Sequence, residues 1–180
     1  FGAHRIGAKQ QAGAWRNRFD DRGFCLCRGQ HHVVAHHHIG ALAAAEKTQR
    51  FMAGYGVLTL HRPSNVDEPA VLARLLGVLA EMARETPLVF PVHPRTRRNI
   101  EAAGLGHLLD GPDFVCTEPL GYLEMLGLMK QARLVLTDSG GIQEETTALG
   151  IPCVTLREST ERPITAEQGT NTVVGRDAQR

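Results

Sequence analysis

Short, continuously apolar runs alternate with helix-like segments over most of the chain, and this alternation constrains the fold more than any other feature. Apolar runs of strand length occupy residues 57–61, 88–92, 114–117, 134–137, 152–156 and 172–174. Apolar residues at helical spacing predict helices over residues 69–82, 97–109, 122–131 and 142–149. Such strands, alternating with helices, are typical of a parallel sheet covered on both faces. We therefore predict a Rossmann-like, doubly wound α/β domain over residues 54–175.

Length, charge and cysteine content exclude several classes of protein. The 180 residues are enough for one domain with a buried core. A formal net charge of +1 gives no general attraction to nucleic acid or to acidic membranes. The sequence shows neither a membrane-spanning apolar run nor a signal-peptide pattern. Four scattered cysteines do not make a disulfide framework, so we expect reduced thiols and a cytoplasmic protein without a nucleic-acid or membrane partner.

The N-terminal part of the chain does not share this pattern. Residues 1–38 are irregular and rich in histidine, and residues 39–53 resemble a short Ala-rich linker helix. The histidines at 31, 32 and 36–38 follow Cys25 and Cys27, so the ligand types for zinc or nickel are present. A crowded histidine run lacks the two separated ligand pairs of a structural zinc site, and we predict adventitious metal binding only. A metal-binding module remains an alternative.

In parallel α/β sheets, ligands bind beyond the carboxyl ends of the strands. Residues 138–145, with the sequence DSGGIQEE, follow the most apolar predicted strand. Two glycines at a helix start let the backbone approach a ligand, and the free N–H groups there favour an anion such as a diphosphate. A carboxylate one turn further, Glu144 or Glu145, would then suit ribose hydroxyls. Alternatively, Asp138 or Ser139 only caps the helix and the glycines form a tight turn.

Three further segments where chemistry could occur also follow predicted strands: residues 61–65, 93–95 and 157–162. Arg157 and Arg162 would favour a phosphate near the helix start, although either can be a solvated loop charge. His61 and His93 each end an apolar run and could exchange protons near neutral pH, although a lone histidine is more often structural. The residues alone leave both interpretations open.

Six blocks of sequence together resemble one enzyme family. They are LHRPSNVD at 60–67, FPVHPR at 90–95, PLGY at 119–122, LTDSGGIQEE at 136–145, RESTERP at 157–163 and GTN at 169–171. Their order and spacing are similar to those of the non-hydrolysing UDP-N-acetylglucosamine 2-epimerases. The resemblance implies that the chain is the C-terminal half of a two-domain enzyme with a glycosyltransferase-B-like fold. Enzymes of this family interconvert UDP-N-acetylglucosamine and UDP-N-acetylmannosamine. In that family UDP is eliminated and added back, and neither metal nor nicotinamide cofactor is needed.

The resemblance also implies roles for individual residues, all of which are expectations at this point. The diphosphate would be bound by the N–H groups of Gly140 and Gly141, the Ser139 hydroxyl and Arg162. Glu145 would bind the ribose, and the backbone near Met125 would face the uracil. His61 matches the active-site histidine. Arg62 and His93 match residues that bind a second, activating UDP-N-acetylglucosamine in some members.

The chain also departs from the family. Members are about twice as long, and their N-terminal domain, which supplies the carboxylates that act on the sugar and the usual homodimer contacts, has no counterpart in residues 1–30. The chain also ends before the family's last helix. We therefore expect a fragment that binds UDP weakly and turns over slowly or not at all, because each missing acid or base group contributes roughly 100- to 10,000-fold in rate. A hydrolysing 2-epimerase and a glycosyltransferase donor domain remain alternatives.

Overall fold

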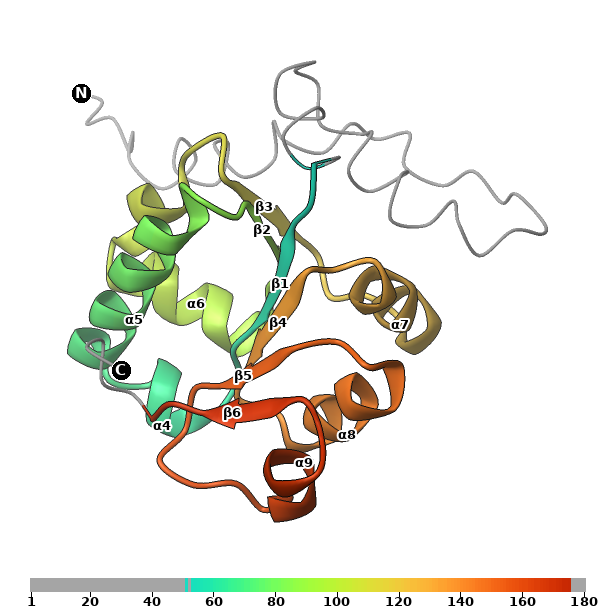
Figure 1. Ribbon diagram of the computed structural model, residues 1–180. Coiled ribbons are helices and arrows are strands. Elements are labelled where there is room, and N and C mark those ends of the chain that lie inside the picture. The colour runs from blue at the N-terminus through green and yellow to red at the C-terminus, as the bar shows by residue number, and fades with distance from the viewer. Residues whose placement is uncertain (1–50, 52, 176–180) are drawn as a thin grey trace, which may run out of the picture. The chain divides into compact units, whose positions relative to one another are not determined.

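The computed structural model describes residues 51 and 53–175, and these contain a six-stranded, wholly parallel sheet (Figure 1). The spatial order is β3-β2-β1-β4-β5-β6. The strands are β1 (Gly56–Thr59), β2 (Leu88–Pro91), β3 (Phe114–Thr117), β4 (Leu134–Thr137), β5 (Cys153–Thr155) and β6 (Asn171–Val173). All six lie within the apolar runs that predicted them, apart from residues at their ends, so the predicted Rossmann-like α/β class is confirmed.

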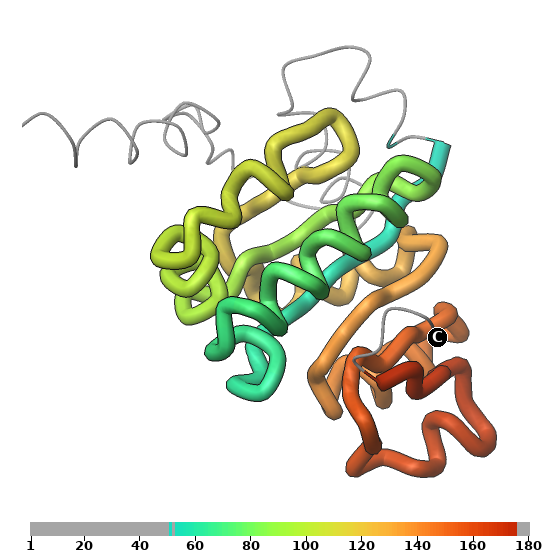
Figure 2. The backbone as a smooth tube through the Cα atoms, turned by 90° about the vertical axis from the view of Figure 1, so that its left-hand side faces the viewer, coloured from blue at the N-terminus to red at the C-terminus, as the bar shows by residue number. Residues whose placement is uncertain are grey.

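Helices cover the sheet in two layers (Figures 1 and 2). α5 and α6 lie on one face, and α7 and α8 lie on the other, with α9 next to α8. The helices are α4 (Pro63–Val66), α5 (Pro69–Ala83), α6 (Pro94–Ala102), α7 (Tyr122–Lys130), α8 (Gly140–Leu149) and α9 (Pro163–Glu167), and η1 (Leu105–Leu109) is a short 3-10 helix. None of the helices in this part of the chain is long and apolar enough to span a membrane.

The apolar strands are buried because both faces of the sheet are packed. Towards α7 and α8, Val57, Val89, Val115 and Val135 join one core cluster with Leu128 and Met129. On the other face, α5 buries one side of its surface through Leu72, Leu75, Leu76 and Leu79. Cys116 and Cys153 are buried, reduced thiols, as predicted.

Prolines define the starts of several helices. In the described residues, α4, α5, α6 and α9 all begin on proline, whose fixed φ suits the first helical position and whose missing N–H leaves no bond unmade there. The sequence predicted a loop at Pro63, but this residue begins the single turn of α4. α9 was not predicted at all.

The prediction of one continuous helix over residues 97–109 is wrong. The structure contains α6 and η1 instead, separated by Gly104. Gly104 has φ 66°, a left-handed conformation that ends a helix and that L side chains rarely adopt.

The predicted His-rich segment, residues 1–38, lies outside the described residues, as do its candidate metal ligands. The predicted linker helix over residues 39–53 also lies outside them, except for Phe51 and Ala53.

The strand order determines where a ligand can bind. β1 and β4 are neighbours at the centre of the sheet, and the chain runs outward from β1 through β2 to β3, then from β4 through β5 to β6. Because the two halves leave this pair in opposite directions, the connections that follow β1 and β4 diverge at their carboxyl ends. This reversal point is where open α/β sheets bind ligands.

Candidate functional site

The carboxyl ends of β1, β4 and β5 bring three of the predicted segments together. Residues 61–65 follow β1, residues 138–141 follow β4, and residues 157–162 follow β5. Hydrogen bonds join all three segments. Asn65 Nδ2 donates to Asp138 Oδ2 at 3.2 Å and to the Leu156 carbonyl, just before the third segment, at 2.9 Å. Arg62 Nη2 donates to Glu161 Oε2 at 3.2 Å. The site therefore combines residues almost 100 positions apart in the sequence.

Asp138 is the centre of this arrangement. Its side chain is fully buried, at 0% exposure. Oδ2 accepts the backbone N–H groups of His61 at 3.1 Å and Arg62 at 2.9 Å, in addition to the Asn65 amide. Oδ1 lies 2.9 Å from His61 Nδ1. Asp138 therefore fixes the loop after β1 to the end of β4, rather than capping α8 as one interpretation of the sequence had it.

These contacts also keep the Asp138 carboxyl ionised. Burial alone would raise its pKa, but the hydrogen bond from the His61 side chain, the backbone N–H groups and the nearby imidazole outweigh burial and lower the pKa. A carboxylate at neutral pH can only accept hydrogen bonds. The half-exposed His61 ring therefore has a buried anion beside its Nδ1.

The start of α8 provides backbone N–H groups next to this carboxylate. Ser139 is the N-cap residue, but within the described part of the chain its hydroxyl makes no cap hydrogen bond. Its own N–H donates to Thr137 Oγ1 at 3.0 Å, and that hydroxyl lies 2.6 Å from Thr59 Oγ1. The loop is thus held by the strands below it, and the Ser139 hydroxyl is not used for that purpose.

Neither glycine at the start of α8 is explained by the protein's own geometry. Gly140 and Gly141 do not have positive φ. A Cβ added at Gly141 would meet no described atom within 4 Å, and one at Gly140 would make only ordinary contact, 3.6 Å, with Glu161. The tight-turn interpretation therefore fails here, because an alanine would fit at either position.

Residues 161 and 162 lie over this helix start with paired charges. Arg62 Nη2 is 3.2 Å from Glu161 Oε2, and Arg157 Nη2 is 2.9 Å from Glu161 Oε1. These two guanidinium groups hold the pKa of Glu161 below its usual range, and Arg157 has the larger effect. Arg162 Nε lies 2.8 Å from Glu144 Oε1 on α8. The structure thus places the predicted phosphate ligand Arg162 beside α8, with Glu144 as its ion-pair partner.

A buried polar network supports the loop that carries Arg162. Gln143 and Asn171 are 0% and 5% exposed. Asn171 Nδ2 donates to Gln143 Oε1 at 3.2 Å and to Thr165 Oγ1 at 3.0 Å, and its Oδ1 accepts the Thr155 hydroxyl at 2.6 Å. The Thr160 hydroxyl also donates to Gln143 Oε1. The network joins α8, β5, β6 and α9. Through it the GTN block, which lies far from the two glycines in sequence, supports the same site.

Met125 and Glu145 lie on the neighbouring helices α7 and α8. Met125 is partly buried against the core cluster, in the first turn of α7. The pKa of Glu145 is raised, chiefly because the side chain is partly buried and also because the Glu144 charge is close. A hydrogen bond from the Tyr122 hydroxyl offsets part of this rise. The Tyr122–Glu145 hydrogen bond joins the two helices, so the residues predicted to bind base and ribose lie on elements in contact with each other.

Arg62 and His93 both lie next to His61. His93 is the N-cap of α6, and its Nδ1 accepts the N–H of Arg95 at 3.2 Å. Its ring centroid is 6.0 Å from that of His61. Arg62 Nε donates to the Asp138 carbonyl at 3.3 Å. Both predicted effector residues therefore adjoin the His61 side of the site.

Sequence reasoning gave Asn65, Gln143 and Glu161 no individual role in the site, and offered Asp138 only a helix cap. All four belong to the quoted blocks, but their contacts are tertiary. A spacing pattern cannot show that Asn65 reaches both Asp138 and Leu156.

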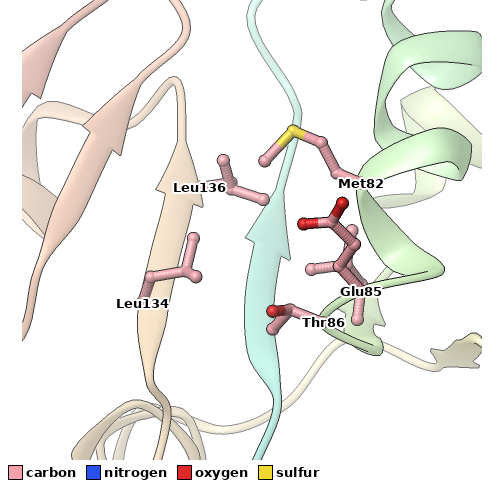
Figure 3. A pocket seen from close by; sticks show the side chains of 6 residues that line it. Met82, Glu85, Thr86, Leu134 and Leu136 are labelled. Atoms are coloured by element: carbon pink, nitrogen blue, oxygen red, sulfur yellow. The ribbon is translucent and has the colours of Figure 1, made fainter.

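A small hollow elsewhere in the domain does not belong to this site (Figure 3). It is lined by Met82, Glu85, Thr86, Leu88, Leu134 and Leu136. Leu88 and Leu134 are the first residues of β2 and β4, so the hollow lies towards the amino ends of the strands. Among residues 51 and 53–175, no group of three His, Cys, Asp or Glu side chains could hold a metal ion.

Comparisons with known proteins identify the family of the chain. Residues 30–180 match the model of the UDP-N-acetylglucosamine 2-epimerase family. The UDP-N-acetylglucosamine 2-epimerase of Methanococcus maripaludis is 44% identical over 128 residues, which cover 69% of this chain and 35% of that relative. The enzyme of the same name from Escherichia coli K12 is 39% identical over 111 residues, or 61% of this chain and 28% of that relative.

A solved structure gives the same result. The Methanocaldococcus jannaschii UDP-GlcNAc 2-epimerase in complex with UDP-GlcNAc and UDP has a TM-score of 0.68 and 33% identity, over 94% of this chain and 49% of that chain. The matched residues cover about a third of the length of these curated relatives. The matched family model, the shared fold and the six sequence blocks together show that the chain belongs to the UDP-N-acetylglucosamine 2-epimerase family.

Proposed function

We propose that this chain provides the UDP-binding part of an enzyme that interconverts UDP-N-acetylglucosamine and UDP-N-acetylmannosamine. The observation that carries the proposal is the start of α8: two glycines that neither backbone conformation nor packing requires, preceded by a serine whose hydroxyl makes no cap bond in the described structure. A diphosphate needs free N–H groups, a hydroxyl and close backbone approach, which this segment offers.

The proposed UDP lies along the starts of α7, α8 and α9. Ser139, Gly140 and Gly141 bind the diphosphate, and Arg162 adds a cation after exchanging Glu144 for phosphate oxygens. Glu145 binds the ribose, and the backbone near Met125 contacts the uracil. The M. jannaschii relative whose structure contains UDP-GlcNAc and UDP supports this choice of ligand.

The sugar then projects towards His61, which we propose as the active-site histidine. Elimination of UDP breaks the bond between the anomeric carbon and the phosphate oxygen, and the C2 proton passes to a carboxylate of the kind that the family's N-terminal domain supplies. Charge accumulates on the diphosphate, where the α8 N–H groups and Arg162 stabilise it. Re-addition of UDP with a proton delivered to the other face of C2 gives the epimer. No step requires a metal or a redox cofactor.

Arg62 and His93 are the proposed contacts for a second, activating nucleotide sugar. Their position supports this role, because Arg62 bonds to the Asp138 carbonyl and the His93 ring lies 6.0 Å from that of His61.

Calorimetric titration of the chain with UDP tests the proposal. We expect saturable binding in the native chain and loss of binding in the double variant Ser139→Ala, Arg162→Ala. Both side chains are partly exposed, so circular dichroism should show an unchanged fold. Equal binding by both proteins would contradict the proposed diphosphate site.

A second assay separates binding from turnover. The chain is incubated with UDP-N-acetylglucosamine in deuterated water, and deuterium at C2 is measured by mass spectrometry. We expect slow or no incorporation if the groups that act at C2 lie in sequence beyond this chain. Rapid incorporation would show that the chain alone is a complete catalyst. Release of free N-acetylmannosamine would identify a hydrolysing enzyme.

A further inference from the structure

The contacts of Asp138 distinguish its two carboxylate oxygens. Oδ2 accepts three N–H donors, from the His61 and Arg62 backbones and the Asn65 side chain, at 3.1, 2.9 and 3.2 Å. Oδ1 faces His61 and lies 2.9 Å from Nδ1 of its ring and 3.2 Å from its backbone N–H. One oxygen thus holds the loop, and the other contacts the imidazole.

This asymmetry determines which ring nitrogen of His61 carries a proton. A neutral imidazole has one N–H and one bare nitrogen. An ionised carboxylate only accepts hydrogen bonds, so a contact of 2.9 Å requires a proton on Nδ1. The bare nitrogen of the neutral ring is then Nε2, on the ring edge away from Asp138.

We propose that Asp138 is a positioning residue that fixes the His61 imidazole in the Nδ1–H tautomer and leaves Nε2 as the nitrogen that exchanges protons. The tautomer follows from the contacts alone, whereas its catalytic meaning rests on the proposed function. In an epimerase, Nε2 would then accept a proton from a bound group or, in the charged ring, donate one.

The other charged groups near His61 do not take over this role. The His93 ring is 6.0 Å away between centroids, which is too far for a direct bond between ring nitrogens in this tilted arrangement. Arg62 directs its guanidinium to the Asp138 carbonyl and to Glu161. Asp138 is therefore the acidic group in contact with the ring among the described residues.

The variant Asp138→Asn makes the inference testable, because an amide has one oxygen. Three donors converge on the Oδ2 position, so the amide oxygen should occupy it. The amide NH2 group then faces His61 and needs an acceptor there. The His61 ring should respond by moving its proton to Nε2. The substitution preserves size and most loop contacts but inverts the tautomer.

Nuclear magnetic resonance with 15N-labelled histidine measures this directly. Spectra that correlate ring carbon-bound protons with both ring nitrogens are recorded at about pH 8, above the ordinary pKa of histidine. His61→Gln identifies the His61 signals. We expect Nδ1–H in the native chain and Nε2–H in Asp138→Asn. Asn65→Ala removes a donor to Oδ2 without touching the imidazole and should keep the native tautomer.

Two results would overturn the inference: an Nε2–H tautomer in the native chain, or an unchanged tautomer in a folded Asp138→Asn variant. If that variant does not fold, the spectrum of the native chain still tests the inference, because the proposed contact requires a proton on Nδ1 of His61. The calorimetric test with UDP is independent of this measurement. Failure to bind UDP would remove the catalytic interpretation but not the tautomer.

Discussion

Gly141 and Gly169 both lie in blocks that resemble the epimerase family, but the structure gives different reasons for them. Gly141 lies in the open, and an added Cβ would meet no described atom within 4 Å. At Gly169 an added Cβ would clash with the Thr165 carbonyl and the Thr147 side chain. The first glycine leaves space that the domain itself does not fill, and the second allows the chain to pass close to α8 and α9.

We therefore expect opposite effects from the same substitution. Gly141→Ala should leave the free energy of unfolding unchanged or increase it by up to about 1 kcal/mol, because alanine is the better helix residue. The same change should weaken UDP binding, since the methyl group enters the diphosphate position. Gly169→Ala should destabilise the domain by about 1–3 kcal/mol through overpacking. Urea unfolding and UDP calorimetry measure both effects; unimpaired UDP binding by Gly141→Ala would argue against the proposed site.

In the proposed complex, Glu144 would compete with phosphate for Arg162. The ion pair is 2.8 Å long, and the two side chains are 44% and 52% exposed. An exposed pair of this kind contributes about 0.2–1 kcal/mol. Glu144→Gln should therefore strengthen UDP binding by up to about fivefold, with a smaller gain at high salt. Glu167→Gln, which removes the same charge at the end of α9, is the matched control for calorimetry. A gain of equal size in both variants would show a general charge effect instead.

The residues of the site were partly predictable. Ser139, Gly140, Gly141 and Arg162 could be singled out because glycines, a hydroxyl and a cation next to a helix start have a direct chemical meaning. The role of Asp138 could not, since the sequence favours a cap for an aspartate at a helix start. Only the folded chain shows that the loop after β1 supplies its donors.

At the scale of elements, strands were easier to predict than short helices. The apolar runs are buried on both faces of the sheet, so their composition alone identifies them. α9 has five residues and α4 has four, which is too short for a helical period to be visible. The break between α6 and η1 depends on the left-handed conformation of Gly104, and a helical apolar pattern continues across it.

The polar network between α8, β5, β6 and α9 should support both stability and binding. Asn171→Ala removes hydrogen bonds to Gln143, Thr155 and Thr165. Leaving these buried groups without their partner should cost about 1–3 kcal/mol in the free energy of unfolding. UDP affinity should also fall, because the loop before α9 positions Arg162. Thr172→Ala, at the exposed next position of β6, should change the free energy of unfolding by about 0.5 kcal/mol or less. Similar losses in both variants would refute the role of the network.

The end of α7 has a different support. The Tyr55 hydroxyl donates to the Leu128 carbonyl at 2.9 Å, near the helix terminus, where carbonyls lack partners within the helix. Burial raises the pKa of Tyr55 far above its ordinary value. At alkaline pH the unfolded chain therefore loses this proton before the folded chain does, and stability falls as pH rises above about 10.

Tyr55→Phe should reduce this alkaline loss and cost about 1 kcal/mol at neutral pH through the lost hydrogen bond. Urea unfolding at several pH values measures both effects. Part of the slope should remain, because burial also raises the pKa of the Cys153 thiol. An unchanged slope in Tyr55→Phe would show that the phenol does not titrate on unfolding.

At the scale of the whole molecule, the nucleotide should stabilise the folded chain. A ligand that binds only the folded state at 100 times its Kd adds about 2.7 kcal/mol, which raises the Tm of a domain of this size by roughly 10 °C. We expect UDP to raise the Tm more than UMP, and UMP more than uridine, at equal concentration. The Ser139→Ala, Arg162→Ala variant should lose the difference between UDP and uridine. Equal shifts for all three ligands in the native chain would place the binding energy in the base rather than in the diphosphate.

The central pairing of β1 with β4 has a consequence for how the molecule folds. Thr59 and Thr137, which face each other across this pair, are 78 residues apart in the chain. Strand pairs of such high sequence separation form slowly, because the entropy of closing a long loop is lost before any stabilising contact forms. Asp138, Ser139 and the glycines meet the loop after β1 only when this pair exists. The proposed capacity to bind a nucleotide is therefore a late product of folding, because a ribosome must complete β4 before the loop after β1 can meet Asp138 and the start of α8.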